Sequence, residues 1–426
     1  MHLDQATSEQ LREQESLLRE KYTQFQQENL NLDLTRGKPN TAQLDLSNEL
    51  DGILNDNYVD KTGTDLRNYG GIDGIAEAKA LFAKVIGLEP EDMLIGGNGS
   101  LPLMYFCAHT ALHHGLRGSD SAWSKESTAI KFLAPVPGYD RHFAACEHLG
   151  IELIPVDMDG DGPDMDKVEA MVKADADIKG IWCVPRFSNP TGVVYSDETV
   201  SRIAKLGNIA GPNFVVFWDN AYAVHAFEEA APELANIMDC CRAEGTEDNI
   251  LLFGSTSKIT LAGAGVAFLG GSSTNITSLK KNLGYSTIGP DKINQLRHVK
   301  FIKDAANLSA HMAKHAKIIK PRFDAVLEKL QDSLGHANMG AWTKPQGGYF
   351  VSFDSLPGLA REIVKLASDV GVKLTPAGAT FPYGKDPADK NIRLAPTFPS
   401  VREIEKAMDV FVVCVQLASI RQKLGE

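Results

Sequence analysis

Residues that could carry out covalent catalysis follow two very apolar segments of the sequence. The segment NILLFGS is followed by Ser257 and Lys258, and NFVVFWD ends at Asp219, with Tyr222 three positions later. A lysine amine can act as a nucleophile toward carbonyl compounds, although most lysines are solvated surface charges. A carboxylate at the end of an apolar strand is costly unless a cation meets it, and a helix cap or a buried salt bridge would also account for it. Their occurrence together suggests a site.

Two further apolar segments are followed by polar turns. After IKGIWCV comes SNPTG, in which turn chemistry explains Asn, Pro and Gly, although Asn189 could also bind a ligand oxygen. After DMLI comes GGNGSLPL, residues 96–103, where glycines allow close backbone approach and the start of a helix presents unpaired N–H groups to an anion. This segment is a candidate phosphate site. It matches neither GxGxxG nor GxxxxGK[ST], which disfavours dinucleotide and P-loop sites.

The apolar segments that precede these residues alternate with helical patterns from about residue 90 to 270. They are DMLIGG, AIKFLAP, IELIPVD, IKGIWCV, NFVVFWD, NILLFGS and AGVAFLG. Continuous apolar runs separated by helices are typical of parallel strands covered on both faces. Ligands of such sheets bind beyond the carboxyl ends of the strands. We therefore expect the α/β class, with a mostly parallel seven-stranded sheet between helices.

The two ends of the chain have a different pattern. Residues 8–29 and 290–335 are predicted to be helical, PQGGYFVSF to be a strand, and LPGLAREIVKLASDVGV to be an amphipathic helix. A short strand pair near KLTPAG and KNIRLAP is expected before a final helix from about Ser400. The expected organisation is an N-terminal arm with part of a small α+β domain (1–60), a large domain (61–310) and the rest of the small domain (311–426).

Composition excludes several classes of function. The formal net charge of -12 disfavours nucleic acids and anionic membranes as partners. The N-terminal segment is polar, and no stretch is long and apolar enough to span a bilayer, so we expect a cytoplasmic protein. The six cysteines lack CxxC spacing and the eleven histidines lack HExxH spacing, which predicts reduced thiols and no metal.

The combination of motifs resembles the fold-type I aminotransferases that depend on pyridoxal 5′-phosphate (PLP). The matching segments, in order, are LTRGKPN, RNYGGIDG, GNGSLPL, PVPGYDRHF, SNPTG, DNAY, STSK, PQGGYF and NIRLAPTFP. They extend over nearly the whole chain, and their order makes the set more specific than any member. The sequence is most similar to the type Ic aspartate aminotransferase subgroup, which is akin to the aminotransferase-like domains of MocR regulators.

The resemblance implies roles around the cofactor. Lys258 matches the Schiff-base lysine, Asp219 the partner of the pyridine nitrogen, and Tyr222 and Asn189 the partners of the phenolic oxygen. Tyr139 resembles the aromatic residue that stacks on the ring. Tyr69 matches a tyrosine that reaches the phosphate of a neighbouring subunit, which implies a homodimer with active sites at the subunit interface. The positions expected to bind the phosphate are Gly99, Ser100, Leu101, Ser255 and Ser257.

The resemblance also implies substrate contacts. Arg393 matches the arginine that binds the α-carboxylate, with Asn189 beside it, and Gly37, after Arg36, matches the small residue that closes over the substrate. A guanidinium suits this role because it can donate two parallel hydrogen bonds to one carboxylate. The expected substrates are an amino acid and a 2-oxo acid. A dicarboxylic substrate needs a second cation, for which the candidates are Arg36, Lys38, Arg141 and Arg297.

One position departs from the family pattern. The family usually has an arginine eight residues after the lysine, paired with the cofactor phosphate, and this chain has Val266 there. Ser257, Lys292 or a helix dipole are the alternatives for that charge.

The expected reaction is ping-pong amino transfer from aspartate to 2-oxoglutarate through Lys258. Another transaminase, a PLP β-lyase and a non-catalytic MocR-like effector module remain alternatives.

Overall fold

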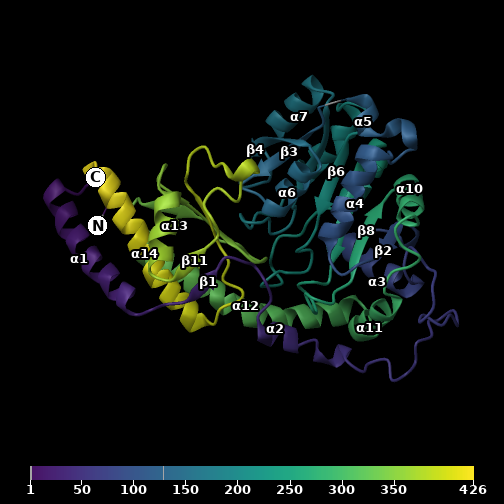
Figure 1. Cartoon of the computed structure of the whole chain (residues 1–426), viewed down its shortest axis with the longest axis horizontal. Helices are drawn as coiled ribbons and strands as arrows, with labels where there is room; N and C mark the ends of the chain where they lie inside the picture. The colour runs from purple at the N-terminus through teal and green to yellow at the C-terminus, as the bar shows by residue number, and fades with distance from the viewer. Residues whose placement is uncertain (1, 128) are drawn as a thin grey trace.

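The largest sheet lies in the middle of the chain. A computed structural model describes residues 2–127 and 129–426 (Figure 1). Within these residues the sheet has seven strands in the order β2-β8-β7-β6-β5-β3-β4. Strands β3 to β7 pair in parallel, and β8 runs antiparallel to both of its neighbours. The strands are β2 (Met93–Ile95), β3 (Lys131–Val136), β4 (Glu152–Asp157), β5 (Ile178–Cys183), β6 (Val215–Asp219), β7 (Ile250–Ser255) and β8 (Ala267–Gly271). The predicted mostly parallel seven-stranded sheet is confirmed.

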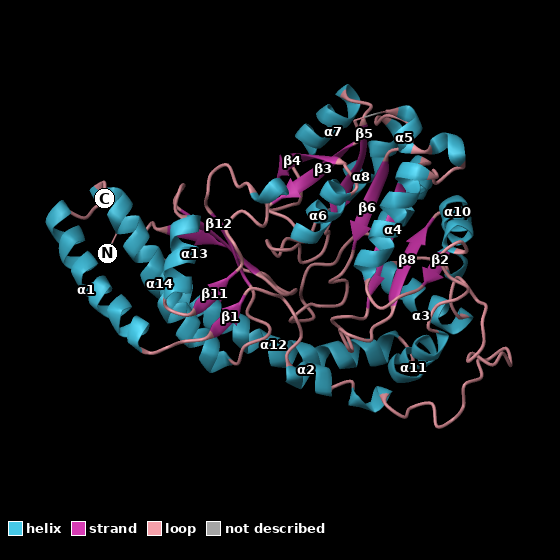
Figure 2. Ribbon diagram, in the orientation of Figure 1, coloured by secondary structure: helices cyan, strands magenta, loops and turns pink. Residues whose placement is uncertain are grey.

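Helices cover both faces of this sheet (Figure 2). Neighbouring strand residues alternate between two buried clusters: Leu133 and Val216 lie in one, Phe132 and Phe217 in the other. The first face is covered by α3 (Ala76–Ile86), α7 (Met165–Ala174), α8 (Asp197–Lys205), α9 (Ile237–Glu244) and α11 (Lys292–Ile302). The second is covered by α4 (Ser100–His113), α5 (Trp123–Glu126), α6 (Asp140–His148) and α10 (Ser273–Leu283). Burial on both faces explains why the strand segments are apolar throughout.

The two ends of the chain share a separate hydrophobic core. Its elements are α1 (Ser8–Gln27), β1 (Leu32–Leu34), β9 (Gly340–Trp342), β10 (Val351–Ser355), α13 (Ala360–Asp369), β11 (Val372–Leu374), β12 (Asn391–Leu394) and α14 (Val401–Leu424). A short helix, α2 (Thr41–Asp45), follows β1. Helix α1 lies along α14, and the termini lie near each other (Figure 1). Ser400 caps α14 through a capping box with Glu403, as expected for a helix that starts there.

The long helix α12 (Ala305–Leu334) contributes to both parts. Its first turns place Leu308 and Met312 in the core of the large sheet, and its later turns place Phe323 and Leu330 in the core of the chain ends. The division predicted at residues 310/311 therefore falls inside one helix. The domain limits themselves stay a prediction.

Two local expectations were wrong. The strands near KLTPAG and KNIRLAP do not pair with each other, because β11 pairs with β1 whereas β12 pairs with β10. The segment PQGGYFVSF is a strand from Val351 onward, whereas residues 345–350 form a loop along the pocket described below. No helix in the described part of the chain combines the length and the apolar character needed to cross a membrane.

Candidate active site

A cavity of about 650 Å³ lies at the carboxyl ends of the large-sheet strands, between that sheet and the chain ends. Loops after β3, β5, β6 and β7 line one side, and residues 35–38, Phe350, Thr375 and β12 line the other. This is where an open α/β sheet is expected to bind a ligand. The predicted site residues that line it are Arg36, Gly37, Ser100, Leu101, Tyr139, Asn189, Asp219, Tyr222, Lys258 and Arg393.

Lys258 lies at the base of the cavity, just beyond β7. Its Nζ is 5.0 Å from the centroid of the Tyr222 ring and 5.9 Å from that of Tyr349. Burial lowers the pKa of Lys258, and the Asp219 carboxylate opposes that shift. A lysine amine in this environment is neutral more often than a surface lysine, as a nucleophile or a base requires.

Asp219 ends β6 and is 2 % exposed. Its Oδ2 lies 3.0 Å from His142 Nε2, and its Oδ1 has no hydrogen-bond partner among the described residues. His142 is itself held by stacking on Trp182, with ring centroids 4.3 Å apart, and by an edge contact with Tyr139. A buried, oriented carboxylate with one free oxygen is suited to accept a hydrogen bond from a cationic ligand nitrogen.

Two phenols stand beside these groups. Burial raises the pKa of Tyr139 to about 12, with a further contribution from the Asp219 charge. Burial also raises the pKa of Tyr222 well above its ordinary value, and the nearby Tyr139 and Asp219 raise it further. Both phenols are therefore protonated at neutral pH and can donate hydrogen bonds.

A buried network of neutral donors lies behind Lys258. His225 Nε2 lies 3.2 Å from the Lys258 carbonyl oxygen, and the Tyr349 hydroxyl donates to the same oxygen at 3.4 Å. Gln43 of α2 donates to Tyr349 Oη at 3.0 Å and, also at 3.0 Å, to His315 Nδ1 of α12. Burial lowers the pKa of His225 to about 3 and that of His315 to about 4. Side chains from the loop after β6 and from the segment before β10 thus hold the lysine backbone.

The predicted phosphate segment is at the start of α4. Gly99 is the N-cap residue without a side-chain cap bond, so the first N–H groups of the helix face the cavity beside Ser100 and Leu101. Ser255 Oγ donates to Ser257 Oγ at 3.1 Å, and Ser257 Oγ donates to the Asn98 carbonyl at 2.9 Å. The serines after β7 and the glycine turn therefore lie together, as an anion site requires.

The structure distinguishes the alternatives for the positive charge that the family arginine would supply at position 266. Val266 is 1 % exposed and belongs to the core, so its position offers no cation. Lys292 Nζ donates to the carbonyl oxygens of Asn68 and Gly70, so this ammonium is bound to the backbone of the RNYGG loop. Ser257 and the N-terminus of α4 remain beside the cavity.

Arg393 of β12 reaches the cavity from the side of the chain ends. Its Nη1 donates to Asp140 Oδ1 at 2.9 Å and to Asn189 Oδ1 at 3.3 Å, and its Nε donates to Thr375 Oγ1 at 3.4 Å. The guanidinium also lies 4.9 Å from the centroid of the Phe350 ring. The side chain is 7 % exposed, so its charge is oriented and largely shielded from water.

The other candidate cations divide into two groups. Arg36, Lys38 and Arg141 line the cavity, whereas Arg297 lines a separate hollow with residues 52–58. Gly37 lies between the first two, where a Cβ would come within 2.4 Å of the Phe350 ring. A side chain at position 37 would therefore require the Phe350 ring to move.

Tyr69 does not reach the cavity of its own chain. It is 82 % exposed, on a loop whose Gly70 N–H donates to the Ile288 carbonyl. Tyr285 and Ile288 on the facing loop are also exposed, at 82 % and 63 %.

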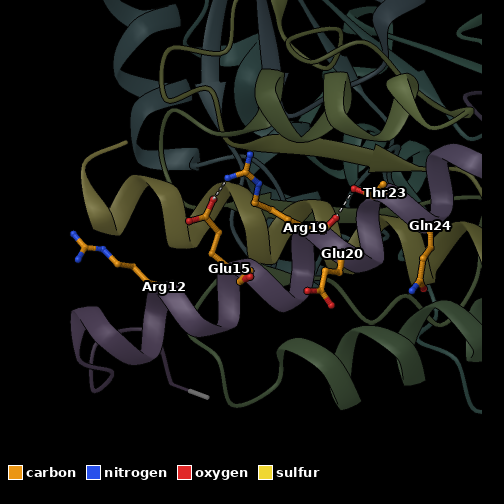
Figure 3. A pocket seen from close by; sticks show the side chains of 7 residues that line it. Arg12, Glu15, Arg19, Glu20, Thr23 and Gln24 are labelled. Carbon is orange, nitrogen blue, oxygen red and sulfur yellow. Dashed lines mark hydrogen bonds and ion pairs between the residues drawn. The ribbon is translucent and has the colours of Figure 1, made fainter.

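Other surface features offer less chemistry. A hollow along α1 is lined by polar and charged side chains, among them Arg12, Glu15 and Arg19 (Figure 3). Helix α1 lies beside α14, at the end of the molecule away from the large sheet (Figure 1). Among the described residues, no group of three or more His, Cys, Asp or Glu side chains is placed to hold a metal ion.

Sequence reasoning missed His142, Asp140 and the network behind Lys258. His142 is three residues after Tyr139, one helical turn into α6, within the quoted motif PGYDRHF. That spacing was the available signal, because residues one turn apart on a helix face the same way.

Comparisons with known proteins agree with this geometry. Residues 6–426 match the family model described as aspartate amino-transferase. An aspartate aminotransferase of Corynebacterium glutamicum is 43 % identical over 403 residues, covering 94 % of this chain and 93 % of that protein.

Solved structures give the same result. An aspartate transaminase from Corynebacterium glutamicum superposes with a TM-score of 0.95, at 41 % identity and 99 % coverage of both chains. The α-aminoadipate aminotransferase LysN from Thermus thermophilus, solved with N-(5′-phosphopyridoxyl)-L-leucine, shares the fold at a TM-score of 0.74 and 22 % identity, over 92 % of this chain and 93 % of that one. The chain therefore belongs to the aspartate aminotransferase family, within the fold-type I aminotransferases that use pyridoxal 5′-phosphate.

Proposed function

We propose that this aminotransferase transfers the amino group of aspartate to 2-oxoglutarate. The observation that carries the proposal is the set of cations in one cavity: Arg393 on one wall, with Arg36, Lys38 and Arg141 around it. Two carboxylates on one substrate need two separate cations, and this cavity supplies them. The name of the Corynebacterium glutamicum relative supports aspartate as the amino donor.

The residues at the base of the cavity fit PLP. The free Oδ1 of Asp219 would accept a hydrogen bond from the protonated pyridine nitrogen, and the Tyr222 hydroxyl and the Asn189 amide would donate to the phenolic oxygen. Tyr139 would cover the ring, and Lys258 Nζ would hold the aldehyde carbon. Ser100, Leu101, Ser255 and Ser257, with Gly99, would surround the phosphate without help from Val266.

Bound PLP supplies an electron sink that stabilises negative charge on the substrate Cα. Lys258 Nζ, whose pKa is lowered by burial, accepts the Cα proton. His142 holds the other oxygen of Asp219 at 3.0 Å, which fixes the orientation of this side chain beside the ring. Arg393 and Asn189 orient the α-carboxylate so that the Cα–H bond faces the lysine.

The substrate side chain would meet the cations on the outer part of the cavity. Arg141 is next to the Arg393 partner Asp140, and Arg36 and Lys38 flank Gly37. Since Arg297 lies outside this cavity, we propose that the distal carboxylate is bound by Arg36, Lys38 or Arg141.

We further propose a homodimer that uses the RNYGG loop. Tyr69, Tyr285 and Ile288 are exposed on two loops joined by a backbone hydrogen bond, and we propose that they form one apolar patch. Apolar side chains exposed together are typical of interaction sites. A second copy over this patch would receive Tyr69 at its own phosphate site.

The six free cysteines support the expected cytoplasmic location.

The direct test is to incubate the purified protein with aspartate and 2-oxoglutarate, and to follow oxaloacetate formation together with the absorbance of the bound cofactor. Spectral change and oxaloacetate are both expected. A spectral response to another amino acid, without oxaloacetate, would assign a different transaminase. Release of pyruvate and ammonia from cysteine or its S-substituted analogues, with the thiol as leaving group, would assign a β-lyase. A bound cofactor with no turnover of any donor would favour an effector module.

A further inference from the structure

The arginine proposed to bind the α-carboxylate already has a carboxylate partner in this chain. Arg393 Nη1 donates to Asp140 Oδ1 at 2.9 Å, which links β12 of the chain ends to the first turn of α6 on the large sheet. The arginine side chain is 7 % exposed and that of Asp140 is 35 % exposed. The aspartate thus approaches from the open side of the cavity, and both residues line it.

The contact has a physical cause. A guanidinium shielded from water is costly without a counter-charge, and Asn189 and Thr375 offer only neutral acceptors. Asp140 provides that counter-charge at 2.9 Å. A substrate carboxylate that binds through two parallel hydrogen bonds needs two N–H groups at one edge of the guanidinium. Both N–H groups of Nη1 are already paired, with Asp140 and with Asn189, and Nε is paired with Thr375. A carboxylate that binds at the edge formed by Nη1 and Nη2 therefore has to displace one of the partners of Nη1, and Asp140 is the one on the open side of the cavity.

We propose that Asp140 is an internal competitor for the substrate α-carboxylate, which must leave Arg393 Nη1 before a substrate binds fully. This inference rests on the proposed role of Arg393. It assigns Asp140 two effects: it raises the KM of every carboxylate substrate equally, whatever the side chain, and it weakens binding of small inorganic anions to Arg393.

The alternative is that Asp140 holds Arg393 in position. The two roles predict opposite changes in carboxylate affinity when Asp140 loses its charge. A competitor that loses its charge lets carboxylates bind more tightly, whereas a support that loses its charge leaves Arg393 less well oriented and weakens their binding.

The test is Asp140→Asn in the holoenzyme. Asparagine keeps the shape and the oxygen that accepts from Arg393, and it removes the charge. We expect the KM of aspartate and of 2-oxoglutarate to fall by roughly three- to tenfold. The dissociation constant of maleate, a dicarboxylate without an amino group, should fall by a similar factor in calorimetry. Chloride should inhibit at lower concentrations.

Glu13→Gln is the matched control, because it removes one negative charge from an exposed position on α1, far from the cavity. It should leave these constants at their wild-type values. Asp140→Ser is a second variant in case the first folds poorly, and it should change maleate binding in the same direction.

A KM or a maleate dissociation constant that stays the same or rises in both Asp140 variants would overturn the inference. Arg393→Lys separates this failure from failure of the proposed function. If Arg393→Lys weakens maleate binding while the Asp140 variants do not strengthen it, Arg393 binds carboxylates and Asp140 does not compete. If Arg393→Lys has no effect either, the assignment of Arg393 itself is wrong.

Discussion

The base and the rim of the cavity differ in how their charges are held. The base (Asp219, Tyr222, Lys258) is buried or enclosed, and the groups that contact it are His142, His225 and Tyr349, each fixed by stacking or hydrogen bonds. The rim cations Arg36, Lys38 and Arg141 are exposed, and Arg393 between them has an exchangeable partner in Asp140. The base is therefore organised when the protein folds, whereas the rim changes its contacts when a ligand arrives.

The largest expected effect comes from the base. Lys258→Ala removes the amine that would hold the cofactor and move the Cα proton, so we expect a loss on the order of 10⁶-fold in kcat. Lys21→Ala, at an exposed position of α1, is the control and should keep full activity. Oxaloacetate formation and cofactor absorbance measure both variants. Substantial turnover by Lys258→Ala would contradict the assigned role.

An intermediate effect is expected at the rim. Arg393→Lys keeps the charge but loses the paired hydrogen bonds, so KM should rise by roughly 10- to 100-fold for both substrates. The matched substitution Arg297→Lys lies in a different hollow and should leave KM as it is. Steady-state kinetics with each substrate varied in turn makes the comparison. Equal effects of the two substitutions would mean that the cavity is not the carboxylate site.

The smallest expected effect is on the pH dependence of the free energy of unfolding, through two histidines behind the base of the cavity. His225 and His315 have pKa values of about 3 and about 4 in the folded protein, below the value of about 6.5 expected when unfolded. The unfolded state therefore binds more protons below pH 6.5, and the free energy of unfolding decreases as pH falls from there toward the folded pKa values. Each histidine should account for about 2 kcal/mol between pH 6.5 and 5.

Denaturant unfolding at both pH values tests this expectation. The variant His225→Gln keeps a donor but cannot titrate. Its free energy of unfolding should therefore decrease less between the two pH values than that of the wild type, by the amount assigned above to one histidine. Identical decreases in the two proteins would show that His225 is not a buried neutral group.

The sequence predicted the base better than the rim, for a physical reason. Lys258 and Asp219 directly follow strands that are apolar on both faces, and parallel strands bring their carboxyl ends together whatever the loops do. Their convergence therefore follows from the strand pattern alone. The position of Ser100 at the same edge of the sheet follows for the same reason, since it lies between β2 and α4, whereas its phosphate role stays a prediction.

The rim depends on contacts between distant segments. Arg141 and Arg297 are indistinguishable in the sequence, and they separate only because α6 and α11 pack on opposite faces of the sheet. Asp140 meets Arg393 across 253 positions of sequence. The network behind Lys258 likewise joins α2, α12 and the loop before β10, which no local pattern links.

The neutral donors behind Lys258 also affect how the protein would respond to acidity. His225 and His315 lose their protons well below neutral pH, and burial raises the pKa of Tyr349 above its ordinary value. None of these three groups changes charge between about pH 5 and pH 9, so the field they impose on the lysine is constant over that interval. A pH–rate profile measured there would report titration in the cavity and on its ligands, undisturbed by these donors.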